Sequence, residues 1–284
     1  MSLLDGKVVL VTGGARGQGR AHAIASAREG ADVALFDLVD DIETVKYPLP
    51  TPADLDVTVK GVEGQGRRAI SFVGDVRSAS DLDGAVAATI SEFGKIDAVV
   101  ANAGIWTLGA SWKLTQQQWD ETLGINLTGV WQTAKAVAPH MIERQEGSIV
   151  MIASVDAFEA GGVYAHYIAA KHGVLGLMKG MAFDLAPHGV RCNAICPGAV
   201  DSPMIDNQPG YDLISGHANG NRKDLIEGGH RFNLLKGTSL LDPMNVADAA
   251  VFLHSPLASR ITGVALPVDA GHVIMPGYNH EPVL

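Results

Sequence analysis

The chain has 284 residues, a hydrophobic fraction of 47% and a formal net charge of -10. A chain of this length can bury most of its apolar surface in one large core, so we expect a single domain over residues 1–284. The 21 basic residues are outnumbered by 31 acidic ones and form no run, which argues against nucleic acid or an anionic membrane as a partner. No apolar stretch approaches the roughly 20 residues that cross a bilayer, and no charged-then-apolar leader opens the chain, which predicts a cytoplasmic protein.

The cysteines and histidines give no sign of a disulfide or a metal site. Cys192 and Cys196 lie four residues apart in an apolar run typical of a strand, where they are too far apart for a disulfide. They are expected to be buried thiols in a reducing compartment. The ten histidines are scattered, without HExxH or paired CxxC spacing, so we expect no metal.

Short β-branched runs alternate with longer helical stretches along the chain. The expected strands are 7–12, 32–37, 69–75, 96–101, 148–153, 190–195 and 264–268. Because most gaps hold 15 or more residues with helical patterning, the strands must be joined by crossovers. The sequence therefore predicts an α/β fold, a doubly wound parallel sheet of seven strands with helices on both faces.

Two segments depart from this alternation. Residues 38–55 are acidic and carry Pro48, Pro50 and Pro52, which predicts an inserted loop instead of a helix. Residues 205–242 mix glycine and polar residues with aromatics and are expected to form a lid or binding loop over a substrate.

A glycine-rich segment follows the first expected strand and opens a helix. Residues 12–19 read TGGARGQG, in which glycines allow a tight turn and the helix N-terminus offers free N–H groups to a pyrophosphate. The residues expected to contact a dinucleotide here are Gly13, Arg16, Gly17, Gln18 and Gly19. Taken alone, the pattern would also suit an ordinary structural turn.

Asp37 sets the expected choice of dinucleotide. It ends the second strand, 18 residues after Gly19, where a carboxylate accepts hydrogen bonds from the adenosine ribose. A carboxylate there would repel a 2'-phosphate, which favours NAD over NADP. Arg16 argues the other way, because a guanidinium beside the loop could pair with that phosphate. An unpaired carboxylate facing a phosphate is costly, so NAD is the expected cofactor.

Further residues follow the third and fourth strands. Asp75 and Val76 could bracket the adenine, and Asn102, Ala103 and Gly104 end the fourth strand at the carboxyl edge of the sheet. Ligands bind at this edge in open α/β sheets. The alternative for each is an ordinary turn at the end of a strand.

Tyr167 and Lys171 lie four residues apart in a helical segment, 164–185, so their side chains share a face. A phenol has a pKa near ~10, and a tyrosine acting as a base near neutrality needs its phenolate favoured by roughly 4 kcal/mol. Lys171 and oxidised nicotinamide would each supply positive charge. Ser154 ends the fifth strand and could hydrogen-bond the substrate oxygen, while Asn126, in the long helix after Thr115, could hold a water. A solvated Tyr–Lys pair and packed polar side chains are the alternatives.

Together these motifs resemble the short-chain dehydrogenase/reductase family over nearly the whole chain. The matching set is Thr12-Gly13-x-x-x-Gly17-x-Gly19, Asp75, Asn102-Ala103-Gly104, Asn126, Ser154, Tyr167-x-x-x-Lys171 and Pro197-Gly198. The resemblance implies a Rossmann-type sheet, a catalytic Ser154, Tyr167, Lys171 and Asn126, and a homotetramer. It also implies that Tyr167 and Lys171 contact the cofactor, that Lys171 hydrogen-bonds the nicotinamide ribose, and that Pro197, Gly198, Val200 and Ser202 lie along the cofactor. The family commonly has threonine where this chain has Ser202.

The inserted segment carries a second resemblance. With Thr44-Val45-Lys46-Tyr47-Pro48-Leu49 and Thr51-Pro52-Ala53-Asp54-Leu55 directly after Asp37, it is similar to the mycofactocin-associated, carveol-dehydrogenase-like branch of the family. That resemblance implies an NAD sealed in place over its adenosine end, with electrons leaving through a separate redox carrier, mycofactocin. A plain surface insertion is the alternative.

The expected substrate enters between Ser154, Tyr167 and the segment 205–242. Trp106, Phe158, Tyr164 and Met204 suggest an apolar pocket, although such residues also form cores. We therefore expect the oxidation of a secondary alcohol, cyclic or terpenoid. An NADPH-dependent carbonyl reductase and a non-catalytic nucleotide-sensing protein on the same fold remain open alternatives.

Overall fold

The centre of the molecule is a seven-stranded parallel sheet in the order β3-β2-β1-β4-β5-β6-β7. The computed structural model describes residues 2–275. The strands are β1 (Val8–Thr12), β2 (Asp32–Asp37), β3 (Ala69–Val73), β4 (Ala98–Ala101), β5 (Gly147–Ile152), β6 (Val190–Pro197) and β7 (Ala265–Val268). All six neighbouring pairs are parallel. The doubly wound α/β fold expected from the sequence is confirmed.

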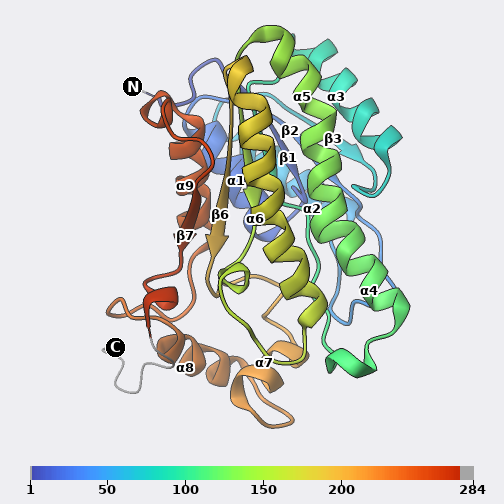
Figure 1. Ribbon diagram of the computed structural model, residues 1–284, viewed down its shortest axis with the longest axis vertical. Helices are drawn as coiled ribbons and strands as arrows, with labels where there is room; N and C mark the ends of the chain where they lie inside the picture. Colours follow the sequence, from blue (N-terminus) through green and yellow to red (C-terminus); the bar gives the residue numbers. More distant parts are fainter. Residues whose placement is uncertain (1, 276–284) are drawn as a thin grey trace.

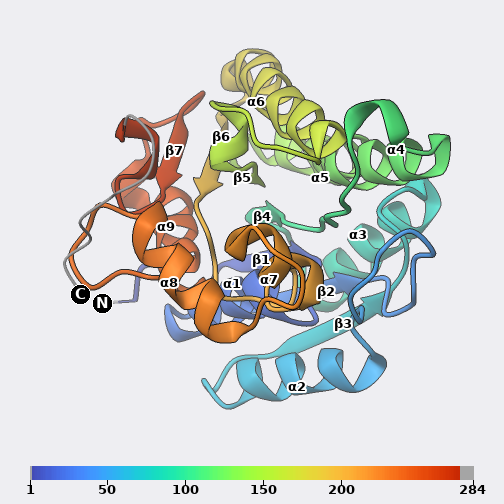
Figure 2. The same ribbon diagram turned by 90° about the horizontal axis from the view of Figure 1, so that it is seen from below.

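Helices cover both faces of the sheet (Figures 1 and 2). One face carries α3 (Ala79–Phe93), α4 (Gln116–Leu123), α5 (Val130–Arg144) and α6 (Ala165–Leu185), and the other carries α1 (Gly17–Arg28), α2 (Pro52–Glu63) and α9 (Pro243–His254). The two apolar layers between sheet and helices form the two core clusters. Since β1 is buried along its whole length between these layers, its sequence VVLV is continuously apolar instead of alternating.

The strand order reverses between β1 and β4, because the chain leaves β1 toward β2 and β3 and returns to build β4 to β7 on the other side. The connections on the two sides of this point lead away from each other, which leaves a crevice at the carboxyl ends of these strands. The short helices α7 (Gln208–Ser215) and α8 (Arg222–Phe232) lie below this edge of the sheet (Figures 1 and 2).

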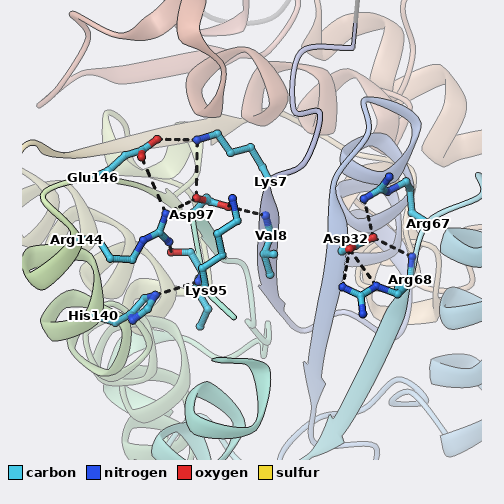
Figure 3. Close-up of polar contacts among 11 residues, drawn as sticks. Lys7, Val8, Asp32, Arg67, Arg68, Lys95, Asp97, His140, Arg144 and Glu146 are labelled. Carbon is cyan, nitrogen blue, oxygen red and sulfur yellow. Dashed lines mark hydrogen bonds and ion pairs between the residues drawn. The ribbon is translucent and has the colours of Figure 1, made fainter. Parts of the chain in front are cut away.

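The amino ends of the strands are held by two carboxylates (Figure 3). The Asp97 carboxylate, just before β4, accepts hydrogen bonds from Val8 N at 2.8 Å and Arg144 Nη2 at 2.8 Å, and it pairs with Lys95 at 3.0 Å. Asp32, at the start of β2, pairs with Arg67 at 2.8 Å and Arg68 at 3.1 Å. These clusters lie at the edge opposite the crevice, and they fix the ends of neighbouring elements.

The inserted segment is shorter than the sequence suggested. Residues 38–51 contain no helix or strand, but α2 begins at Pro52, so the expectation of a loop through residue 55 was wrong for its last four residues. Proline suits the first turn of a helix because no N–H is needed there. Thr51 caps the helix by accepting a hydrogen bond from Asp54 N. The prolines therefore mark the end of the loop and the start of a helix.

The segment 205–242 is also more regular than expected, because it contains α7 and α8. Asn207 and Asn221 cap their N-termini, accepting hydrogen bonds from Gly210 N and Lys223 N. The many glycines in this segment hid the helical pattern.

A third difference lies after Thr115, where the sequence predicted one long helix. A π-helical turn, Gly124–Gly129, instead separates α4 from α5.

Within residues 2–275, no helix is long and apolar enough to cross a membrane. Cys192 and Cys196 are buried, free thiols in β6, as expected.

His22 and His254 form a buried, uncharged pair between α1 and α9. Burial lowers the pKa of both imidazoles to about 3. Neither ring nitrogen of His22 has a hydrogen-bond partner within the described residues, and His254 Nδ1 lies 2.9 Å from Ser148 Oγ. The unfolded chain takes up a proton on each ring below about pH 6.5, whereas the folded chain does not until about pH 3. Their contribution to stability is therefore complete above pH 6.5 and is lost as the pH falls.

We predict that the free energy of unfolding falls between pH 6 and pH 4.5 by up to about 1.4 kcal/mol per pH unit for each of the two histidines. The change His22→Leu should reduce this slope, because it removes one of the two proton uptakes. Urea titrations across this pH range measure the slope. The exposed His217→Gln serves as the control and should leave it unchanged. An unaltered slope in His22→Leu would show that His22 is not the group responsible.

Candidate active site

A cavity of about 1150 Å³ opens at the carboxyl edge of the sheet. Its walls contain nearly all the residues singled out from the sequence: Gly13, Arg16, Gly17, Gln18, Gly19, Asp37, Asp75, Val76, Asn102, Ala103, Gly104, Ser154, Tyr167, Lys171, Pro197, Gly198, Val200 and Ser202. Asn126 does not line the cavity, and neither does Phe158, which is 46% exposed. The fold thus brings together segments from the ends of six strands, β1 to β6, around one cavity.

The glycine-rich turn forms the floor of one end of this cavity. Gly13 adopts a positive φ of 66°, and a Cβ atom on it would lie 2.8 Å from Ala103 Cα. A Cβ on Gly19 would lie 1.8 Å from the Gly13 carbonyl oxygen, so no larger residue fits there. Asn102 Nδ2 donates to Thr12 O at 3.0 Å and to Gly13 O at 3.2 Å, which fixes the turn against the end of β4.

The N-terminus of α1 faces the cavity without a side-chain cap. Its first N–H groups have no partner within the helix and carry the positive end of the helix dipole. Gln18 Oε1 is buried beside them without a hydrogen-bond partner among the described residues. The backbone N–H groups are the donors that suit a bound pyrophosphate, whereas the Gln18 oxygen can only accept a hydrogen bond.

Asp37 lies at the end of β2 with 7% of its surface exposed. One carboxylate oxygen accepts a hydrogen bond from Ala15 N at 2.8 Å, and the other is 3.5 Å from Val39 N. Burial raises the pKa of Asp37, against the effect of these backbone donors. The second oxygen therefore has capacity for a ribose hydroxyl.

Arg16 turns toward the inserted loop, where its guanidinium donates a hydrogen bond to the Pro48 carbonyl oxygen. Its charge is thereby engaged in holding the loop.

Tyr167 and Lys171 lie one turn apart near the start of α6 in the cavity wall, where Lys171 is buried and Tyr167 is half-buried. Lys171 Nζ donates to Ile152 O at 2.8 Å and lies 5.4 Å from the centroid of the Tyr167 ring. Burial lowers the pKa of Lys171 to about 8, so the amine is mainly protonated at neutral pH. Burial also raises the pKa of Tyr167, with a further contribution from the Asp156 charge. The phenol therefore needs nearby positive charge before it can accept a proton.

Ser154 leaves β5 at the same edge. Its Oγ accepts a hydrogen bond from Asp156 N at 3.1 Å and lies 3.0 Å from Asp156 Oδ2. The nearby Ser154 hydroxyl partly offsets the effect of burial on the Tyr167 pKa. The serine hydroxyl and the phenol thus meet at one point of the cavity wall.

Asn126 occupies the π-helical turn behind this wall and is fully buried. Its Oδ1 accepts from Ile105 N at 2.8 Å, and its Nδ2 donates to Ile105 O at 2.8 Å. The Asn126 side chain therefore fixes the loop after β4. A π-helical turn frequently marks a functional site.

Sequence reasoning missed Tyr47, although it recognised the segment that carries it. Tyr47 is buried in the cavity wall, and its hydroxyl accepts a hydrogen bond from Trp106 N at 3.2 Å. The loop 38–51 is further held by a hydrogen bond from Thr44 to Glu121 and one from Gln117 to Glu43 at 3.0 Å. No local pattern foretells these long-range contacts with α4 and the loop after β4.

Asp156, Glu159 and His272 are three further wall residues without a signal in the sequence. His272 Nε2 lies 2.6 Å from Glu159 Oε1, and its ring stacks on Phe232 of α8 with 3.5 Å between centroids. This contact joins the loop after β5 to the helices below the cavity.

The helices α7 and α8 are anchored by Arg222. Its guanidinium makes two hydrogen bonds to the Asp201 carboxylate, at 2.9 and 2.7 Å, and pairs with Asp206 at 2.8 Å. The charged contact connects α8 directly to the segment after β6 that carries Ser202.

Comparison with known proteins places this site in a family. The pattern of the short chain dehydrogenase family matches residues 7–210. The chain belongs to this family. It is therefore a short-chain dehydrogenase, an oxidoreductase, as its motifs suggested.

Its relatives include a (-)-trans-carveol dehydrogenase from Rhodococcus erythropolis, 43% identical over 95% of this chain and 99% of that protein. The crystal structure of carveol dehydrogenase from Mycobacterium avium in complex with NAD superimposes with a TM-score of 0.93 at 38% identity, covering 97% of this chain and all of that one. A short chain dehydrogenase from Mycobacterium paratuberculosis bound to NAD gives 0.86 at 34% identity, covering 96% of this chain and all of the other.

Proposed function

We propose that this short-chain dehydrogenase oxidises a cyclic, apolar secondary alcohol with NAD as the hydride acceptor. The observation that carries the proposal is the convergence of Ser154, Tyr167 and Lys171 on the cavity that also receives the uncapped N-terminus of α1. A proton-handling pair and a dinucleotide cradle thereby share one space. The NAD complexes of the two similar crystal structures support the choice of cofactor.

The dinucleotide would be held along the carboxyl edge. The N–H groups at the start of α1, with Gly13, Gly17, Gln18 and Gly19, would bind its pyrophosphate, and Asp37 its adenosine ribose. Asp75 and Val76 would enclose the adenine. Asn102, Ala103 and Gly104 would lie beneath the cofactor, and Pro197, Gly198, Val200 and Ser202 beside the nicotinamide. Bound there, NAD supplies a positively charged ring that takes a hydride from carbon.

Tyr167 would act as the base that removes the hydroxyl proton of the substrate. Burial disfavours the Tyr167 phenolate when no cofactor is bound. The protonated amine of Lys171 and the positive nicotinamide would both lower the pKa of the phenol. Lys171 is fixed by the Ile152 carbonyl and would extend to the nicotinamide ribose. Ser154 would hold the substrate oxygen by a hydrogen bond while charge shifts on it. Asn126 would support this set through the loop that it fixes.

The substrate part of the cavity favours an apolar ring. Trp106 and Tyr164 meet edge to face with 5.8 Å between centroids, and Tyr164 and Tyr167 do so at 6.2 Å. Met204 and Phe232 face the same space from the segment after β6 and from α8. Similarity to a carveol dehydrogenase agrees with a terpenoid-like alcohol.

We further propose that NAD remains bound between turnovers and is reoxidised in place by a separate redox carrier such as mycofactocin. The loop 38–51 is tied to Arg16, Trp106, Gln117 and Glu121, and its Tyr47 forms part of the cavity wall. Release of the dinucleotide would require these contacts to break together.

A homotetramer in the cytoplasm completes the proposal. Large apolar side chains such as Phe183 on α6 and Leu257 after α9 are exposed on the single chain and would suit subunit interfaces. The free thiols of β6 fit a reducing compartment.

The preference for NAD over NADP can be tested by binding. Cofactor-depleted protein should bind NAD at least about tenfold more tightly than NADP, because Asp37 repels a 2'-phosphate and Arg16 is engaged with Pro48. Asp37→Asn should narrow this gap, and the exposed Asp41→Asn should not. Calorimetric titration measures both dissociation constants. Equal or tighter binding of NADP would overturn the preference.

The role of Tyr167 as the base can be tested by removing its hydroxyl. Tyr167→Phe should lower kcat by about 10²- to 10⁴-fold, because the phenylalanine cannot accept a proton. The affinity for NAD should stay within a few-fold, which calorimetry checks on the same preparation. A near-normal rate would refute the role of Tyr167.

Retention of NAD between turnovers can be tested on the purified protein. Protein purified without added nucleotide should release about one NAD per chain on denaturation and should turn over with an artificial electron-accepting dye. Thr44→Val removes the contact between the loop and Glu121 without altering the cavity wall, and it should speed NAD loss by at least about tenfold. The exposed Thr128→Val, the same chemical change, should have no effect.

NAD content and dissociation rate can both be followed by absorbance after rapid separation of protein and nucleotide. Absence of NAD in the purified protein, together with many turnovers on free NAD, would exclude a retained cofactor.

A further inference from the structure

Asp156 places a carboxyl group in the substrate part of the cavity, two residues after Ser154. The residue is half-buried and belongs to the 3-10 turn Val155–Ala157. Its Oδ2 lies 3.0 Å from Ser154 Oγ, and its Oδ1 accepts a long hydrogen bond of 3.4 Å from the Tyr164 hydroxyl. No salt bridge reaches it within the part of the chain that the structure describes. The carboxyl group shares the cavity with Glu159, Lys171 and His272, but among the described residues it forms no ion pair with any cation.

The charges facing Asp156 do not compensate its burial. Glu159, in the same loop, adds negative charge, whereas the charges of His272 after β7 and Lys171 on α6 favour the carboxylate. Burial raises the pKa of Asp156, with Glu159 contributing in the same direction. The carboxyl group would therefore gain from a further hydrogen-bond donor in the cavity.

The position of Asp156 indicates where that donor would come from. In the proposed function, Ser154 Oγ contacts the oxygen of the carbon that is oxidised, and Asp156 Oδ2 is hydrogen-bonded to the same Oγ. A carboxylate accepts up to about four hydrogen bonds, and the described contacts use two. A group on the next carbon of the substrate would therefore lie beside this carboxyl.

We propose that Asp156 binds a second hydroxyl group of the substrate, on the carbon adjacent to the one that is oxidised. The preferred substrate class is then a cyclic vicinal diol with an apolar body. This inference rests on the proposed function and narrows its substrate. Oxidation moves a hydride from the first carbinol carbon to NAD and the proton of its hydroxyl to Tyr167, and a carbon–oxygen double bond forms. The second hydroxyl is unchanged, so the product is an α-hydroxyketone.

Three six-membered-ring alcohols test the proposal: cyclohexanol, trans-1,2-cyclohexanediol and trans-1,4-cyclohexanediol. The 1,4-diol matches the number of hydroxyls but places the second one out of reach of Asp156. Wild-type holoenzyme, assayed with the electron-accepting dye, should give a kcat/KM for the 1,2-diol at least about tenfold above both other alcohols.

The Asp156→Ala variant should bring kcat/KM for the 1,2-diol to within about threefold of kcat/KM for the other two alcohols, whatever its effect on the rate with cyclohexanol. The isosteric Asp156→Asn should keep part of the preference. The exposed Asp184→Asn on α6 is the control and should behave as wild type.

The outcomes separate this inference from the function on which it rests. If wild type oxidises all three alcohols with equal kcat/KM, the inference is overturned and the proposed function stands. This comparison uses wild-type protein only, so it does not depend on whether a variant folds. An equal loss with all three alcohols in Asp156→Ala would mean that Asp156 only positions Ser154. No turnover of any alcohol, with NAD present and the chain folded, would overturn the proposed function and the inference together.

Discussion

The buried amine of Lys171 is the group on which the site depends. Desolvation disfavours an ammonium at this depth and lowers its pKa to about 8. The amine donates a hydrogen bond to the Ile152 carbonyl oxygen, the one hydrogen-bond partner found for it in residues 2–275. The same burial raises the pKa of the neighbouring Tyr167. Two groups that burial drives toward neutrality are thereby placed within 5.4 Å of each other, ring centroid to nitrogen. A positive charge arriving in the cavity would lower the pKa of Tyr167, and the protonated Lys171 amine acts on the phenol in the same direction.

The surrounding fold keeps this pair in position from a distance. The carboxyl ends of the parallel strands lie along one edge of the sheet, and this brings Ser154, Asn102 and the turn at Gly13 together. The carboxylates of Asp97 and Asp32 fix the opposite edge. The loop 38–51 closes one side of the cavity, and α7 and α8, anchored by Arg222, close the other. The proton-transfer pair and the segments that close the cavity thus come from different parts of the chain. The closing segments can therefore differ in sequence while Tyr167 and Lys171 stay the same.

The sequence predicted the relative positions of side chains correctly where these positions depend on local spacing. The four-residue interval from Tyr167 to Lys171 is a property of any helix, and the glycines at 13, 17 and 19 are required by a tight turn. The prediction failed where the decisive contact lies far along the chain. Pro52 looked like part of a loop because its capping partner Thr51 and its place at a helix start were not recognised. The glycines near 229 hid α8, and nothing near Tyr47 indicates that its hydroxyl meets Trp106 N. Phe158 was expected to contribute to an apolar pocket, but it does not line the cavity and is exposed.

A crystal structure of the protein with NAD and an unreactive alcohol analogue tests the central claim most directly. The account predicts the Tyr167 hydroxyl and Ser154 Oγ both at hydrogen-bond distance from the alcohol oxygen, with the Lys171 amine on the nicotinamide ribose. A Tyr167 hydroxyl turned away from the nicotinamide in every subunit, with the Lys171 amine bonded elsewhere, would contradict it.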